Sequence, residues 1–210
     1  MNFLAHIYLS GDNPRVMVGN FIGDFVKGRN LLQQFDGEVA LGIELHRSID
    51  FYTDHHPVVK QSKARLWQGY RHYAAVLIDV FYDHFLSRYW EQYSPMPLSE
   101  YSTNTFAVLK SFEFSLPEGV RQLLPYMIRQ NWLLNYGNFN GLQQALNGMA
   151  QRTRHESKME RSVADLQLHY DAFKAEFEQF FPDLIQHCNM MINQANKNPI
   201  LYPNFKTDAK

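Results

Sequence analysis

Apolar residues recur along the chain mostly at intervals of three and four positions, and sustained alternation of apolar and polar residues is scarce. This period is typical of helices with one buried face, so we expect an all-α protein. Turn and breaker residues divide the pattern into segments. The expected helices are 16–27, 37–53, 58–67, 72–93, 98–112, 117–136, 140–152 and 158–181, with a break or kink at Pro182 before a last segment to about residue 196.

These segments contain no internal repeat and no low-complexity stretch, and 210 residues fit a single core. We therefore expect one helical bundle domain at 1–196 and a C-terminal tail at 197–210. A hydrophobic fraction of 45%, with 16 Phe and 12 Tyr, is enough to build that core, so a largely disordered chain is excluded.

The expected helix 72–93 is apolar around almost its whole circumference, which indicates a central, buried helix. It nevertheless contains Asp79 and Asp83, which share a face because they are four residues apart. Two buried carboxylates repel each other and raise each other's pKa unless a cation lies between them. His84 points about 100° away from Asp83, so it is either a supporting residue or a packed core histidine.

A second polar stripe lies on the expected helix 37–53, where His46, Asp50 and Asp54 follow one another at steps of four. Neighbouring members of such a stripe share a helical face, so an imidazole and carboxylates converge there. Asp54 comes at the helix end before Pro57, and we assign it to a cap or to a position beside the ligands.

Two further candidates for this site precede the helix. Asp24 lies in the stretch Gly19 to Phe25, whose glycines allow a close backbone approach, and His6 lies in an apolar N-terminal stretch. Carboxylates and imidazoles without a nearby thiolate suit manganese, magnesium, iron or zinc, and we rank manganese or magnesium first. Such a metal activates water and neutralises phosphate oxygens in hydrolysis.

Other interpretations of these residues stay open. The acidic groups and histidines could form a buried network of ion pairs with Arg47 and Arg88 that binds no metal. Arg152 and Arg154 could grip a phosphate bidentately or could be solvated arginines at a helix end.

Charge and cysteine content exclude some classes of protein. A net charge of −1 argues against a nucleic-acid binder. Cys188 is the only cysteine, which excludes an internal disulfide and fits a reducing compartment. The first residues lack the pattern of a signal peptide, and no stretch approaches the roughly 18 apolar residues of a membrane span. We expect a cytoplasmic protein without a membrane span.

Five groups of residues together resemble the acyl carrier protein phosphodiesterases, also called acyl carrier protein hydrolases, which look like distant members of the HD phosphohydrolases. The groups are Met1 to His6, Gly19-Asn20 with Gly23 to Val26, His46-Arg47 with Ile49-Asp50 and Thr53-Asp54, Asp79-Val80 with Asp83 to Arg88, and Asn147 to Ala150 with Arg152. One departure is clear: HD enzymes carry an adjacent His-Asp pair, whereas the adjacent pair here, Asp83-His84, is reversed.

The resemblance implies a manganese-dependent phosphodiesterase that removes 4′-phosphopantetheine from a serine of holo-acyl carrier protein, within fatty acid and lipid metabolism. It implies a metal site among Asp24, His46, Asp50, Asp79 and Asp83, with His6, His84 and Asp54 as further ligands or supporting residues. Arg47 and Arg152 are then candidates for binding phosphate. Because acyl carrier proteins are typically acidic, Arg15, Lys27 and Arg29 are candidates for docking the partner.

Two other classes of function fit the same residues. A metal-dependent phosphohydrolase of the HD type could act on a small nucleotide or phosphate ester without any carrier protein. A non-catalytic helical binding protein would use the Asp and His groups only as structural ion pairs.

Overall fold

The computed structural model describes residues 1–197, and within that range it contains eleven α-helices and no strand, which confirms the all-α class. The α-helices are α1 (Phe3–Tyr8), α2 (Pro14–Ile22), α3 (Gly37–His55), α4 (Pro57–Tyr70), α5 (Tyr73–Arg88), α6 (Leu98–Ser111), α7 (Glu118–Arg129), α8 (Trp132–Asn135), α9 (Phe139–Arg152), α10 (Ser162–Leu168) and α11 (Tyr170–Lys197). Short 3₁₀ helices join them, of which η1 (Gly23–Phe25) contributes to the site.

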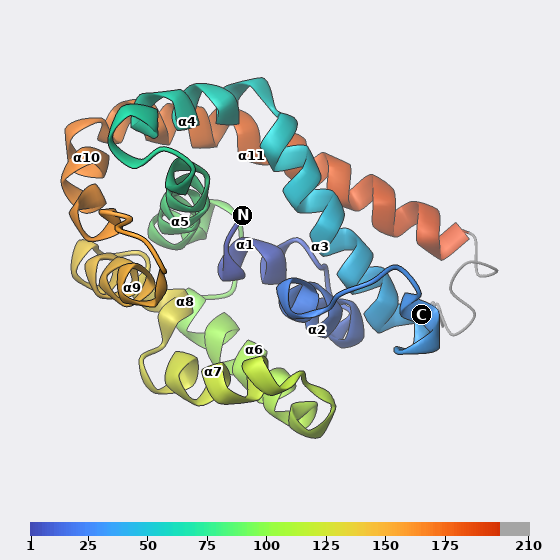
Figure 1. The fold of residues 1–210 in the computed structure, drawn as a ribbon. Helices are drawn as coiled ribbons and strands as arrows, with labels where there is room; N and C mark the ends of the chain where they lie inside the picture. The colour runs from blue at the N-terminus through green and yellow to red at the C-terminus, as the bar shows by residue number, and fades with distance from the viewer. Residues whose placement is uncertain (198–210) are drawn as a thin grey trace.

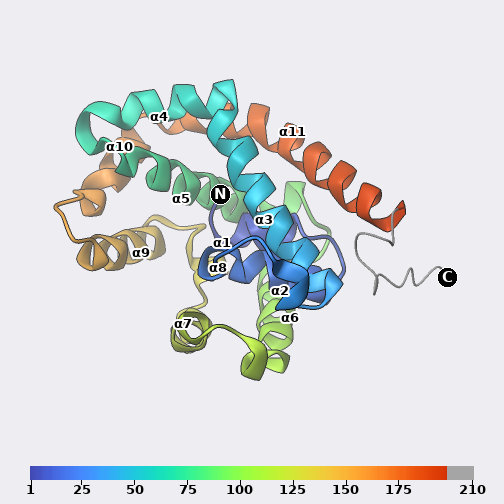
Figure 2. The ribbon, with the colours of Figure 1, turned by 45° about the vertical axis from the view of Figure 1, so that its right-hand side comes forward.

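Helix α5 lies in the interior of the bundle, as the sequence predicts. Eleven of its sixteen residues are buried. Helices α4 and α11 run side by side along one edge of the molecule, and α6 and α7 lie at the opposite edge (Figures 1 and 2). The short helix α1 packs against α2 and α5 near the centre. This arrangement brings α1, α3 and α5 together around the polar residues described below.

Local signals explain where the helices of the site begin. The side chain of Asp36 accepts hydrogen bonds from the backbone nitrogens of Glu38 (3.1 Å) and Val39 (3.0 Å), so it caps α3. Asn13 caps α2 in the same way, with Pro14 at the first helical position, where a missing N–H costs nothing.

Helices α2 and α3 touch through their backbones at two glycines. A Cβ added to Gly19 would lie 2.1 Å from the Val39 carbonyl oxygen, and one added to Gly42 would lie 2.1 Å from the Val16 carbonyl oxygen. These distances leave no room for a side chain, so the close crossing requires glycine at both positions. The crossing sets Asn20 of α2 against His46 of α3.

Several expected boundaries are wrong. The expected helix 16–27 ends at Ile22, and residues 117–136 divide into α7 and α8 because Asn131 takes a left-handed backbone (φ 39°) between them. Helix 72–93 ends at Arg88, and 158–181 is divided between α10 and α11. The N-terminal helix α1 was not expected from the pattern.

Of the break or kink predicted at Pro182, the break is wrong, because α11 continues through Pro182. Its side chain is exposed, whereas Phe181 and Leu184 are buried. Proline removes one hydrogen bond from a helix, and a carbonyl freed on the outer side can bond to water, so packing of the inner face carries the helix through. The predicted tail falls almost entirely at 198–210, outside the described residues. No described helix is long and apolar enough to cross a bilayer.

Candidate metal and phosphoester site

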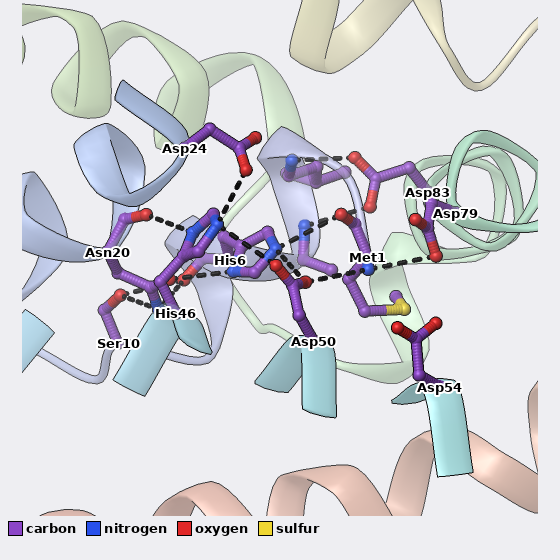
Figure 3. Close-up of polar contacts among 12 residues, drawn as sticks. Met1, His6, Ser10, Asn20, Asp24, His46, Asp50, Asp54, Asp79 and Asp83 are labelled. Atoms are coloured by element: carbon purple, nitrogen blue, oxygen red, sulfur yellow. Dashed lines mark hydrogen bonds and ion pairs between the residues drawn. The ribbon is translucent and has the colours of Figure 1, made fainter. Parts of the chain in front are cut away.

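Four of the predicted site residues converge between α1, η1 and α3 (Figure 3). His46 Nε2 lies 3.1 Å from Asp24 Oδ1 and 3.2 Å from Asp50 Oδ2, one helical turn further along α3. His6 Nε2 lies 3.3 Å from the other oxygen of Asp50. The two imidazole rings stack, with centroids 4.0 Å apart and planes inclined by 17°. The cluster therefore presents two ring nitrogens and two carboxylates to one small space.

Asn20 determines which nitrogen of each histidine carries a proton. Its Nδ2 donates to the His6 carbonyl oxygen (2.7 Å) and to Ser10 Oγ (2.9 Å), so its Oδ1 must be the atom that accepts from His6 Nδ1 (2.8 Å). His46 Nδ1 donates to the backbone oxygen of Asn20 at 2.7 Å. Both rings thus hold a proton on Nδ1 and direct Nε2 at the site.

The Nε2 atoms face only hydrogen-bond acceptors among the described residues. His6 Nε2 lies 3.1 Å from the Met1 carbonyl oxygen besides Asp50, and His46 Nε2 lies between Asp24 and Asp50. A lone pair facing carbonyl and carboxylate oxygens is repelled unless a cation lies between them. The geometry therefore requires a proton or a metal ion at this point.

A proton meets this requirement at His46 and not at His6. Burial lowers the pKa of His46, but the hydrogen bonds and charges of Asp24 and Asp50 outweigh it and raise that pKa to about 9. At His6 burial prevails over Asp50, and neighbouring His46 lowers the pKa further. The pKa of Asp50 is lowered, because the hydrogen bond from His46 and the positive charge of the nearby α-amino group outweigh its partial burial. One imidazole therefore stays neutral with its lone pair aimed at acceptors.

The donor set fits a divalent metal. One ligand atom each from His6, His46 and Asp50 lie within 4.8 Å of one another, and Asp24 adds a carboxylate beside His46. Imidazole and carboxylate ligands suit manganese, iron and zinc. Each ring also has its second nitrogen bonded to an oxygen of Asn20, as metal-bound histidines usually require.

Gly23 makes room for His46. A Cβ on Gly23 would lie 2.2 Å from Cγ of the His46 ring, so any side chain there would displace the imidazole. Because Gly23 immediately precedes Asp24 in η1, the same tight turn carries Asp24 to His46 Nε2. The sequence predicts a close backbone approach at the glycines before Asp24, and Gly23 allows the His46 ring to lie against the backbone there.

The structure separates Asp83 and His84 from this cluster. Asp83 Oδ2 accepts from Leu4 N (2.8 Å) and Oδ1 from Ala5 N (3.1 Å), so both oxygens hold the first turn of α1. Burial raises the pKa of Asp83 to about 7 despite these donors. Asp83 therefore lies outside the group formed by His6, His46 and Asp50, and its role as a metal ligand stays a prediction.

His84 and Asp54 also have partners elsewhere. His84 Nδ1 donates to the Tyr136 carbonyl oxygen (2.7 Å), and its Nε2 lies 3.2 Å from the Tyr170 hydroxyl. Asp54 lies apart from the histidines in Figure 3 and pairs with Lys63 at 2.6 Å, and no side chain caps the start of α4 at Pro57. Asp79 Oδ1 lies 3.0 Å from the α-amino group of Met1, which is 3.5 Å from Asp50. The α-amino group of Met1 thus lies between Asp79 and Asp50, at the edge of the site.

The arginines and the lysine predicted to act here lie at different places. Arg47 donates to the Val26 carbonyl oxygen at 3.1 Å and so braces the loop after Asp24. Arg152 Nε donates to the Gly148 carbonyl oxygen, and its side chain lines a cavity beside the site. Arg15 is paired with Asp36 and Glu38.

Lys27, Arg29 and Arg154 are exposed. The alternative of an ion-pair network with Arg47 and Arg88 is not what the geometry shows, because the site's carboxylates pair with the histidines and the α-amino group.

Asn20 and Ser10 are the residues of the site whose roles sequence reasoning missed. The sequence places Asn20 within the family resemblance and indicates no role for it. A signal was present, because an amide inside the apolar run Val16 to Ile22 needs buried hydrogen-bond partners. Nothing in the pattern marks Ser10 as the partner of Asn20.

The fold and site define a class: an all-α protein whose central helices enclose a cluster of histidines and aspartates suited to a divalent metal. The chain belongs to the acyl carrier protein phosphodiesterase family, because the family model described as "Acyl carrier protein phosphodiesterase" matches residues 1–184. The resemblance seen in the sequence is thereby confirmed.

Relatives named acyl carrier protein phosphodiesterase extend this match. The protein of Escherichia coli O6:H1 (strain CFT073) is 35% identical over 190 residues, which cover 90% of this chain and 98% of the relative. That of Enterobacter sp. (strain 638) is 37% identical over 198 residues, covering 94% and 99%. That of Photorhabdus laumondii is 34% identical over 187 residues, covering 89% and 94%. No solved structure matches the chain, so the likeness to HD phosphohydrolases stays a prediction.

Proposed function

We propose that this protein hydrolyses the phosphodiester between 4′-phosphopantetheine and the serine of holo-acyl carrier protein, and that it does so with a divalent metal. The family supplies the substrate class. The observation that carries the metal is the geometry of His6: Asn20 accepts from its Nδ1, and its Nε2 faces two acceptors, the Met1 carbonyl oxygen at 3.1 Å and Asp50 at 3.3 Å.

In this proposal His6, His46 and Asp50 hold the metal, and Asp24 offers a further carboxylate. The side chain of Asp24 is 70% exposed, which puts it on the open side where substrate arrives. A divalent metal supplies a water of lowered pKa and offsets charge on the phosphate oxygens. Manganese is our first choice, since imidazole with carboxylate favours it over magnesium.

The surrounding residues fix this arrangement before substrate binds. Asn20 keeps both Nδ1 protons in place, so neither histidine needs to change tautomer when the metal enters. Arg47 holds the loop at Val26 behind Asp24, and this assigns Arg47 to positioning, while Arg152 is the arginine available to phosphate.

Mass spectrometry of holo-acyl carrier protein tests the proposal. The purified protein is treated with chelator, dialysed, and incubated with the carrier protein with and without Mn²⁺. We expect loss of the phosphopantetheine arm only when metal is present. Elemental analysis of the untreated protein should find a transition metal close to one per chain.

Other outcomes would select the alternative functions. An intact carrier protein together with metal-dependent hydrolysis of nucleotides would favour a small-molecule phosphohydrolase. An intact carrier protein together with a chain that binds no Mn²⁺ would favour a non-catalytic binding protein.

A further inference from the structure

A cavity of about 860 Å³ lies between α7, α8 and α9, and the site described above does not include it. Its walls carry many uncharged polar groups, and among the described lining residues Arg152 is the only charged one. The side-chain amides are those of Gln122, Gln130, Asn135, Gln144, Asn147 and Gln151. Trp132, Tyr126 and Met149 add apolar surface.

The cavity adjoins the metal site at two points. Gly119 in its wall contacts the ring of Phe25, since a Cβ there would be 3.0 Å from that ring, and Phe25 directly follows Asp24. The ring of Trp132 packs near that of Phe3, with centroids 6.3 Å apart. Phe3 lies on α1, the short helix that also carries His6. The cavity wall therefore contacts Phe25 beside Asp24 and Phe3 on the helix that carries His6.

A buried polar group at this junction also lacks a hydrogen-bond partner. Tyr136 lines the cavity with only 1% of its surface exposed, and its hydroxyl lies beside the Asn2 side chain without a well-aligned hydrogen bond to any described residue. Buried hydroxyls are nearly always bonded, so an unpaired one marks a place where a ligand atom or water is expected.

We propose that this cavity receives the pantetheine arm of the substrate, with Arg152 as the cation for its phosphate; the proposal rests on the proposed function above. The arm is a long, uncharged chain of amides, a hydroxyl and methyl groups that ends in a phosphodiester. Side-chain amides with an aromatic wall match such a chain, whereas an acyl chain would need an apolar lining and a second phosphate would need further cations. The volume is also in the range of small-molecule sites.

Gly148 offers a way to fill the cavity without disturbing the fold. It lies in α9 and lines the cavity, and a Cβ added there meets no atom within 4 Å. Gly148→Leu therefore occupies the space of the arm and should also favour the helix, because glycine is a poor helix former. Gly69 in α4 is equally open and does not line this cavity, so Gly69→Leu is the matched control.

Calorimetric titration with pantetheine and with 4′-phosphopantetheine tests the proposal without requiring turnover. We expect Gly148→Leu to weaken both ligands by at least about tenfold while Mn²⁺ affinity and circular dichroism stay as in the parent, and Gly69→Leu to bind like the parent. Arg152→Gln should weaken 4′-phosphopantetheine and leave pantetheine unchanged, because only the former carries phosphate. Unchanged binding in Gly148→Leu would overturn the proposal.

Failure of this inference and failure of the proposed function are distinguishable. If Gly148→Leu blocks pantetheine binding but the parent never cleaves holo-acyl carrier protein, the cavity assignment stands and the proposed reaction is wrong. If the parent cleaves the carrier protein and Gly148→Leu cleaves it with the same KM, the reaction stands and the cavity assignment is wrong.

Discussion

Asn20 is the residue through which both histidines of the site are held. Its side chain and its backbone oxygen each accept from one Nδ1, so a single residue fixes two tautomers. The neutral state of His6 and the protonated state of His46 then follow from burial and from the two nearby carboxylates. At this scale the chemistry of the site depends on hydrogen bonds as much as on the ligands.

Replacing Asp50 or Asp83 by asparagine tests which of the two carboxylates binds the proposed metal. Asp50→Asn removes the carboxylate shared by both histidines, and we expect Mn²⁺ affinity to fall by about 100-fold or more. Asp83→Asn changes a carboxylate that holds Leu4 N and Ala5 N, so we expect stability to fall by about 1–3 kcal/mol.

Calorimetry with Mn²⁺ and urea unfolding measure the two quantities. Asp83→Asn should keep its Mn²⁺ affinity within a few-fold of the parent. Loss of metal binding in a folded Asp83→Asn would place Asp83 among the metal ligands.

His84 should make the protein less stable in mild acid. Burial lowers its pKa from the usual 6.5 to about 4, so the unfolded chain binds the proton more readily between these values. The stability that neutral His84 provides is present above pH 6.5 and is lost as pH falls towards 4, up to about 3 kcal/mol at 1.36 kcal/mol per pKa unit.

Urea unfolding at pH 7 and pH 4.5 measures this effect. The positive charge of Arg88 disfavours protonation of the His84 imidazole, and the Tyr170 hydroxyl contacts His84 Nε2. We expect His84→Gln to lose clearly less stability than the parent on acidification. Equal losses would show that other groups cause the acid sensitivity.

Some of the candidate site could be predicted from the sequence for a simple reason. His46 and Asp50 meet because a step of four residues always places side chains on one helical face, and that rule is local. Asp83 obeys the same rule with Asp79, yet its partners Leu4 and Ala5 are about 80 residues away, so no local pattern reveals that it caps α1. Long-range hydrogen bonds decide between ligand and cap.

At the scale of elements, the crossing of α2 and α3 builds the site. Gly19→Ala would place a methyl group against the Val39 carbonyl oxygen, so the helices must separate. We expect a loss of about 1–3 kcal/mol in stability. We also expect weaker Mn²⁺ binding, because Asn20 moves away from His46 Nδ1.

The control for this prediction is Gly69→Ala, also a helical glycine but in open space. It should gain up to about 1 kcal/mol through helix propensity and keep its metal affinity. Thermal unfolding and Mn²⁺ titration of the two variants give the comparison. A Gly19→Ala protein with parental stability and metal affinity would show that the crossing tolerates a side chain.

Helix interiors could be predicted from the sequence better than helix ends. The start of α3 follows from Asp36 and Gly37, where the capping signal lies within three residues. Pro182 misled the prediction, because its cost depends on whether the freed carbonyl reaches water, and that depends on which face of α11 packs. Tertiary packing decided these boundaries.

On the scale of the whole molecule, the charges around the site bear on how a protein substrate docks. The net charge is −1, so attraction of an acidic carrier protein must come from a local group of cations. Of the three residues predicted for this role, Arg15 is compensated by Asp36 and Glu38. Lys27 and Arg29 are exposed on the loop that follows η1 and Asp24.

Lys27→Glu should therefore raise KM for holo-acyl carrier protein by up to about fivefold at low salt and leave kcat unchanged, because an exposed pair contributes at most about 1 kcal/mol. The increase should shrink as salt is added, since screening weakens exposed charges. Lys60→Glu, the same change at an exposed position of α4, should leave KM within error of the parent. Equal effects of the two variants would show that net charge, and not a docking surface beside Asp24, sets the affinity.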